Sequence, residues 1–175
     1  MPISNYARRL RAKVGNELLL MPSVTALVFD ESRRVLLVRP THRENVWVAP
    51  GGAVDPDEHP QDAVVREVWE ETGLLVEPTE LRGVFGGPEY RVWYANGDEV
   101  GYMMAVYECR LKGGALRADG DEISEARYFS PDELDTIERH EEPCGIFIDS
   151  MSDLFGSKVP DQWINKVLHT IRYCP

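Results

Sequence analysis

Six segments of the chain carry the pattern of apolar and polar positions that is typical of β-strands. Short runs rich in β-branched and aromatic residues, bounded by turn residues, favour strands. They occupy residues 24–29, 35–39, 81–85, 90–94, 100–110 and 125–129. The polar turn at 30–33 is expected to join the first two runs as a hairpin, and the Asn96-Gly97 turn is expected to join the fourth and fifth.

Helical patterns occupy residues 5–14, 60–72, a short segment after Ser130, and 161–172. In the second helix Pro60 suits the first turn, and Gly73 suits the left-handed position just past the end. Ser130 as N-cap and Glu133 three residues later form a capping box. The last segment is amphipathic and can pack against a sheet.

Strands interspersed with a few helices, without strict alternation, predict an α/β fold with a mixed sheet covered by helices. Residues 40–60 are expected to form an irregular loop. A chain of 175 residues is the length of one ordinary domain. We therefore expect a single domain over 1–175, with a core at about 20–137, an N-terminal helix and a C-terminal helical extension.

The composition is that of a globular protein, with 43% hydrophobic and 28% charged residues. No apolar run approaches the length of a transmembrane helix, and the N-terminus lacks the pattern of a secretory signal. The three cysteines, Cys109, Cys144 and Cys174, are far apart and odd in number, which argues against a disulfide framework. A cytoplasmic location is expected.

The formal net charge of −11 opposes binding to nucleic-acid phosphates. We therefore expect a small-molecule partner, with no nucleic acid and no membrane. Four basic residues gather between Arg8 and Lys13, in the segment expected to form the first helix. That helix is more consistent with a docking or dimer element than with a DNA contact.

Three carboxylates share one stripe of the helix predicted at 60–72. At about 100° per residue, Glu67, Glu70 and Glu71 fall within an arc of roughly 100°. The residues expected on the opposite, buried side are Val65, Val68, Trp69 and Thr72. Like charges at these spacings repel, so the helix needs compensation. A hard divalent cation that shares its oxygen ligands with a phosphate would supply it, whereas a solvated acidic face is the alternative.

The residues around this stripe decide between these two interpretations. From Gly52 to Leu74 the chain matches G-x5-E-x7-R-E-U-x-E-E-x-G-U at every position, where U is apolar. The probability that such a match arises by chance is on the order of 10⁻⁹ per start position. The chain therefore resembles the Nudix hydrolases, the MutT-like superfamily. The W-x-x-P-G-G segment at 47–52 and the stretch from Glu122 to Leu134 are also similar to that family.

The resemblance implies an α/β/α sandwich with a mixed sheet, and attack of water on a phosphorus of a nucleoside diphosphate linked to another group. It implies that Mg²⁺ or Mn²⁺ is held by Glu67, Glu70 and Glu71 together with the backbone carbonyl of Gly51. Arg66 would orient these carboxylates, and Glu58 would support the loop. Gly51 and Gly52 would let the backbone approach the phosphates.

The general base is expected to be either a glutamate of the Gly52–Leu74 motif or a downstream carboxylate, with Glu122 favoured over Glu125. Arg39 and Arg43 are candidates for binding phosphate oxygens. Aromatic residues that could stack on a base are Phe85, Tyr90, Trp93, Tyr94, Tyr102 and Tyr107, of which no more than half can face a site.

The substrate stays open between several classes: ADP-ribose, nucleotide sugars, dinucleoside polyphosphates, and intact or oxidised nucleoside triphosphates. Pro88 is the family's marker for the first class and Tyr90 for dinucleoside polyphosphates, and both are present. Two other functions remain as alternatives, a nucleotide-sensing module without catalysis and an isomerase of allylic diphosphates. A homodimer is the expected assembly.

Overall fold

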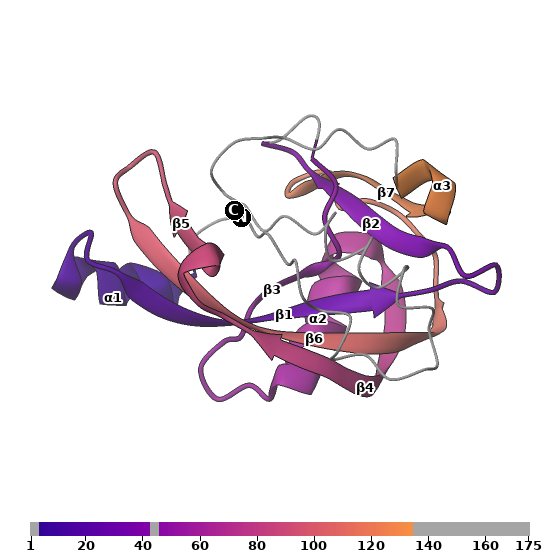
Figure 1. Ribbon diagram of the computed structural model, residues 1–175, viewed down its shortest axis with the longest axis horizontal. Coiled ribbons are helices and arrows are strands. Elements are labelled where there is room, and N and C mark those ends of the chain that lie inside the picture. The colour runs from indigo at the N-terminus through magenta and orange to yellow at the C-terminus, as the bar shows by residue number, and fades with distance from the viewer. Residues whose placement is uncertain (1–3, 43–45, 135–175) are drawn as a thin grey trace.

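The computed structural model describes residues 4–42 and 46–134 (Figure 1). The strands are β1 (Leu19–Val28), β2 (Val35–Pro40), β3 (Gly51–Ala53), β4 (Leu74–Phe85), β5 (Arg91–Trp93), β6 (Glu99–Gly114) and β7 (Ile123–Phe129). The helices are α1 (Asn5–Val14), α2 (Pro60–Thr72) and α3 (Pro131–Leu134), with a 3-10 turn at Pro88–Tyr90.

The strands form two sheets. The larger has the order β3-β1-β6-β4, and β5 also pairs with β6. Strands β1 and β6 run parallel, whereas the other pairs in this sheet are antiparallel, so the sheet is mixed. The smaller sheet is the antiparallel pair β2-β7. Together with α2, these sheets confirm the predicted α/β class.

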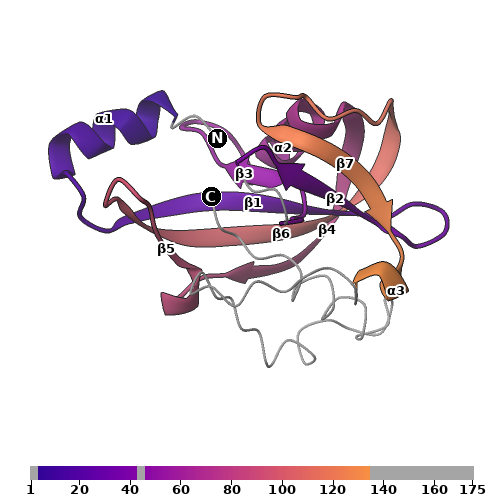
Figure 2. The ribbon, with the colours of Figure 1, turned by 90° about the horizontal axis from the view of Figure 1, so that it is seen from above.

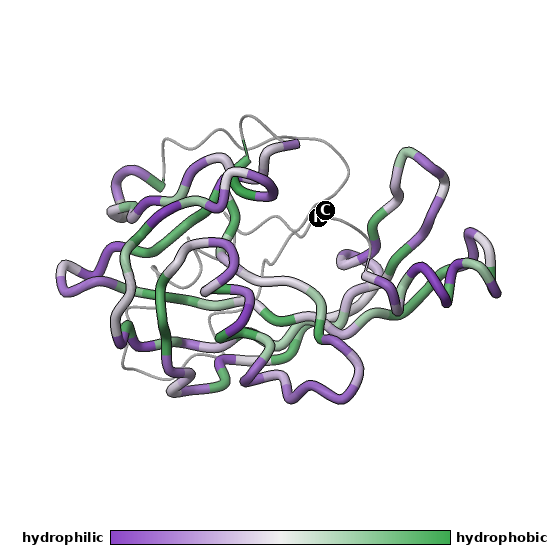
Figure 3. Tube along the Cα trace, turned by 180° about the vertical axis from the view of Figure 1, so that it is seen from behind, coloured by the Kyte–Doolittle hydropathy of each residue, from purple (hydrophilic) through white to green (hydrophobic). Residues whose placement is uncertain are grey.

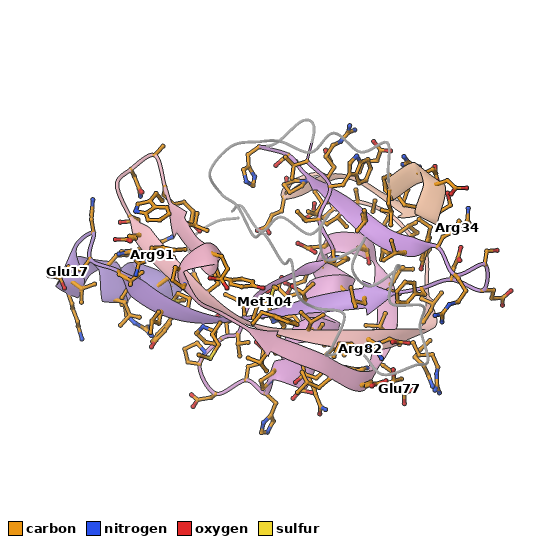
Figure 4. All side chains as sticks on the ribbon, in the orientation of Figure 1. Glu17, Arg34, Glu77, Arg82, Arg91 and Met104 are labelled. Atoms are coloured by element: carbon orange, nitrogen blue, oxygen red, sulfur yellow. The ribbon has the colours of Figure 1, made fainter. Side chains whose placement is uncertain are left out.

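Two apolar clusters fill the two faces of the large sheet. Neighbouring residues of β1 point to opposite faces, and Ala26 belongs to one cluster while Leu27 belongs to the other. The cluster around Ala26 includes Val64 and Val68 of α2, so α2 covers that face. The cluster around Leu27 is completed from the small sheet and α3; its members include Leu37, Met104, Phe129 and Leu134. Met104 lies in the middle of the sheet (Figure 4), and hydrophobic residues follow the central strands (Figure 3).

The helix boundaries predicted from the sequence are confirmed for α1 and α2. Gly73 has the expected left-handed conformation, with φ 66° and ψ 12°. The capping box at the start of α3 is also present, because Ser130 and Glu133 exchange two hydrogen bonds. The predicted helix 161–172 lies outside the described residues. No helix among residues 4–42 and 46–134 has the length and apolarity needed to cross a membrane.

Four predictions need correction. The segments predicted at 24–29 and 81–85 begin earlier, at Leu19 and Leu74, because the long strand β6 offers pairing partners along its whole length. The predicted loop 40–60 contains the short strand β3. The hairpin predicted at 30–33 forms its turn, but β1 and β2 share only the single bridge Phe29–Val35, and β2 then pairs with β7.

Candidate functional site

Two of the three stripe glutamates, Glu67 and Glu71, lie on the packed side of α2 rather than opposite it. The buried residues of this helix are Ala63, Val64, Glu67, Val68, Glu71 and Thr72. Their spacing of one and then three positions traces one helical face. The expectation that all three glutamates oppose a buried face is therefore wrong for two of them. Glu67 and Glu71 are only 6% and 5% exposed, whereas Trp69, which was expected to be buried, is 49% exposed.

Arg66 joins three carboxylates around the start of the site. Its guanidinium donates to both oxygens of Glu58 at 2.8 and 2.9 Å, and also to Glu67 at 2.8 Å. A longer contact of 3.2 Å reaches Glu70, and the carbonyl of Ala53 accepts at 3.0 Å. Arg66 thus fixes the loop before α2 to the helix and orients two of the stripe glutamates.

The short strand β3 brings backbone against the buried carboxylates. The N–H of Gly51 donates to Glu71 at 3.1 Å. A Cβ at Gly52 would lie 2.5 Å from the carboxylate of Glu67, and a Cβ at Gly51 would collide with the carbonyl of Val24. Close packing of β1 against β3 therefore requires Gly51, whereas a side chain at Gly52 would displace the Glu67 carboxylate.

Burial and mutual repulsion perturb the site carboxylates. Burial raises the pKa of Glu67 to about 7, although Arg66 opposes the shift. Burial, reinforced by the charge of Glu67, raises the pKa of Glu71 well above its ordinary value. In contrast, the hydrogen bonds from Arg66 lower the pKa of Glu58. The site thus holds more negative charge than its own cations neutralise.

The structure separates the two downstream candidates for the general base. Glu122 lies close enough to Glu67 and Glu71 to raise their pKa values, and its own pKa is raised, first by burial. Glu125 instead forms an ion pair of 2.5 Å with Arg39, opposite it in the β2-β7 ladder. Only Glu122 of the two therefore belongs to the carboxylate cluster.

Of the predicted substrate-binding residues, Gly52 lies against the Glu67 carboxylate, whereas Arg39 and Tyr90 make their contacts elsewhere. Besides its ion pair, Arg39 lies over the ring of Trp47. Tyr90 is 5% exposed and stacks on Phe85 in the core, where burial raises its pKa to about 12. The apolar cluster takes up this ring because Tyr90 precedes a strand that pairs with the core strand β6. Arg43 lies outside the described residues.

A cavity of about 440 Å³ opens beside the carboxylates. Glu67, Glu70 and Glu122 line one end. The other end is formed by the start of β1, the β5–β6 hairpin and α1, and its lining includes Arg11, Met21, Tyr94, Asp98 and Tyr102. The volume lies within the range of about 300–1,000 Å³ that is usual for small-molecule sites.

The NUDIX domain family matches residues 19–148 of the chain. The chain belongs to the Nudix family. Its relatives include a MutT-like protein of Streptomyces ambofaciens, which is 37% identical over 64% of this chain and 65% of its own length. An ADP-ribose pyrophosphatase of Methanocaldococcus jannaschii is 31% identical over 61% of this chain and 60% of its own length. The chain thus spans less than two thirds of these relatives.

The fold of this Nudix domain is also similar to a solved structure, a MutT protein from Methanosarcina mazei Go1. The two have a TM-score of 0.55 and are 27% identical, with 70% of this chain and 85% of that chain covered. The NUDIX family match over residues 19–148 contains α2, β3 and Glu122, but it excludes α1.

The residues of this Nudix site suit a hard divalent cation. Among the described residues no group of three or more histidine, cysteine or carboxylate side chains is already arranged around a metal position. The donor set nevertheless fits Mg²⁺ or Mn²⁺, which prefer carboxylate oxygens. Arg66 engages Oε1 of Glu67 and Oε2 of Glu70, so the other oxygen of each is not held by this guanidinium.

The sequence did not predict that residues near α1 line the same cavity as the carboxylates. Tyr94 and Tyr102 were among six aromatic candidates, and they line it as a pair with 2.7 Å between their hydroxyl oxygens. Arg11 and Asp98 were not singled out, because a basic helix and an Asn-Gly turn carry no signal that they meet. Only the extension of β1 and β6 beyond the core brings them together.

Proposed function

We propose that this protein is a divalent-metal-dependent pyrophosphohydrolase that cleaves the diphosphate link of a nucleoside diphosphate derivative. The observation that carries the proposal is the buried pair Glu67 and Glu71, which lies against the β3 backbone, with Glu67 lining the cavity. Burying two carboxylates is unfavourable unless a cation compensates them. The activity given in the name of the Methanocaldococcus relative supports the same class of reaction.

Each residue has a defined task in this proposal. Glu67, Glu70, Glu71 and the carbonyl of Gly51 would hold the cations. When bound, the cations would neutralise the diphosphate and acidify water. Arg66 keeps Glu67 and Glu70 oriented through the contacts described above.

Glu122 would accept the proton of the attacking water. The water oxygen bonds to phosphorus, the bridging P–O bond breaks, and two phosphate-bearing products leave. The pKa of Glu122 is raised toward neutral pH, as a general base requires.

The environment of Cys109 disfavours an isomerase of allylic diphosphates. Cys109 is buried in the apolar cluster beneath α2, and burial raises its pKa to about 12. Such a thiol is a poor acid–base catalyst and lies outside the cavity. A nucleotide-sensing module would use the same cavity without turnover, and this outcome is distinguished by the test below.

The test is a screen with Mg²⁺ and Mn²⁺ against ADP-ribose, nucleotide sugars, dinucleoside polyphosphates and oxidised nucleoside triphosphates. We expect one class to be hydrolysed, with activity abolished by a chelator and lowered by orders of magnitude in Glu70→Gln. Glu122→Gln should lower kcat at least about tenfold, whereas Glu125→Gln serves as the control of equal charge change. Binding without turnover would instead identify a sensing module, and wild-type turnover in chelator would refute the metal role.

The cytoplasmic location and the homodimer remain proposals. The location depends on the cysteine content of the sequence. A homodimer is supported by exposed apolar side chains on one face of the large sheet, where Leu20, Val84 and Met103 are 76%, 57% and 59% exposed. Light scattering on the purified chain tests the assembly, and a monomer at all concentrations would exclude the dimer.

A further inference from the structure

Helix α1 lies outside the matched Nudix range but lines the cavity of the site. The family match begins at residue 19, whereas α1 spans Asn5–Val14. Figures 1 and 2 show α1 beside the β5–β6 hairpin, at the end of the molecule away from α3. None of its residues is buried. Its position is therefore set by specific polar contacts rather than by an apolar core.

Arg11 supplies most of these contacts. Its guanidinium donates to the carbonyls of Gly15 at 3.1 Å, Glu17 at 2.6 Å and Glu99 at 2.7 Å. It also pairs with Asp98 at 3.4 Å, and both side chains are only 12% exposed. One side chain thus fastens α1 to the connection that follows it and to the first residues of β6.

The end of the cavity next to α1 has a different chemistry from the end next to α2. Leu19, Met21 and Val100 give it an apolar lining. The hydroxyl pair of Tyr94 and Tyr102 also lines the cavity and can exchange hydrogen bonds with a polar ligand. An apolar surface with a few polar groups is suited to a flat heterocycle and its sugar.

The end of the cavity next to α1 offers no net positive charge to a polyanionic group. The acidic lining residues are Asp55, Glu67, Glu70, Asp98 and Glu122, and the cationic ones are Arg11 and Arg66. Both arginines are already engaged in ion pairs. Of these charges only Arg11 and Asp98 lie next to α1, and they pair with each other, so this end suits an uncharged nucleoside better than a group rich in phosphates.

We propose that α1 forms one wall of the subsite that holds the nucleoside of the substrate, and that Arg11 is the positioning residue which keeps this wall in place. The inference rests on the proposed function for its substrate class. It assigns recognition of the non-reacting end to a helix outside the family domain, with Ala7 at the wall.

The experiment places a large side chain of α1 in the subsite and measures the binding of two ligands. Ala7→Trp places an indole at the wall, and Ala12→Trp is its matched control, because Ala12 is exposed on the same helix and lines no part of the cavity. Binding of AMP and of ribose 5-phosphate is measured with Mg²⁺ by calorimetry on the full chain. We expect wild type to bind AMP more tightly than ribose 5-phosphate, and Ala7→Trp to weaken AMP alone, roughly tenfold or more.

Arg11→Met, with Arg9→Met as the control on an exposed site, tests the positioning role. For the substrate selected by the screen, Arg11→Met should raise KM several-fold with kcat within about twofold, because the carboxylates are untouched. Equal behaviour of Ala7→Trp and Ala12→Trp, or equal weakening of both ligands, would overturn the inference. A selective loss of AMP binding in a chain that hydrolyses nothing would support the subsite while rejecting the proposed hydrolase activity.

Discussion

Replacing Glu67 by Gln should remove a pH-dependent destabilisation of the metal-free protein. The pKa of Glu67 rises from 4.5 to about 7 on folding, mainly through burial. Below pH 4.5 the carboxyl is protonated in both states and has no effect. As the pH rises to 7, the unfolded chain loses this proton first, so the folded state loses stability. A shift of this size corresponds to about 3 kcal/mol, all of it lost above pH 7.

In Glu67→Gln this pH-dependent loss should be absent, because the amide cannot ionise and its oxygen can still accept from Arg66. Urea and thermal unfolding are measured in chelator at pH 5 and pH 8. The fall in Tm of wild type should exceed that of the variant by roughly 6–12 °C for a chain of this size. Glu31→Gln, an exposed site in the turn after β1, controls for net charge. Identical pH dependence in wild type and Glu67→Gln would refute the link between burial and ionisation.

Three further substitutions test the packing around the carboxylates. Gly52→Ala places a Cβ 2.5 Å from the Glu67 carboxylate, so kcat should fall at least about tenfold while circular dichroism is unchanged. Arg66→Lys cannot bond both oxygens of Glu58, and urea unfolding should show a loss of about 2–4 kcal/mol; a loss under 0.5 kcal/mol would contradict the network. Gly73→Ala forces a left-handed alanine, and the same assay should show a loss of about 1–3 kcal/mol, whereas no change would mean that the helix end relaxes.

Local sequence signals predicted the helix boundaries correctly. The predictions of strand boundaries and strand pairing failed, because these depend on the partner strands. Pro60 and Gly73 fixed α2 at both ends, since their conformational preferences act within a few residues. The starts of β1 and β4 were predicted too late, because a strand extends as far as β6 offers hydrogen bonds. The separation of β2 from β1 likewise depends on β7, which lies far along the chain.

For the site, the sequence by itself identified the candidate residues: the spacing from Gly52 to Leu74 indicated the carboxylates and Arg66, and the W-x-x-P-G-G segment indicated the two glycines. The tertiary structure alone decided that Glu67 and Glu71 are buried, that Tyr90 belongs to the core and that Glu122 rather than Glu125 joins the cluster. It also placed α1 at the cavity. Residue types and spacings encode which ligands are possible, but burial and long-range contacts depend on strand pairing, which a local pattern does not contain.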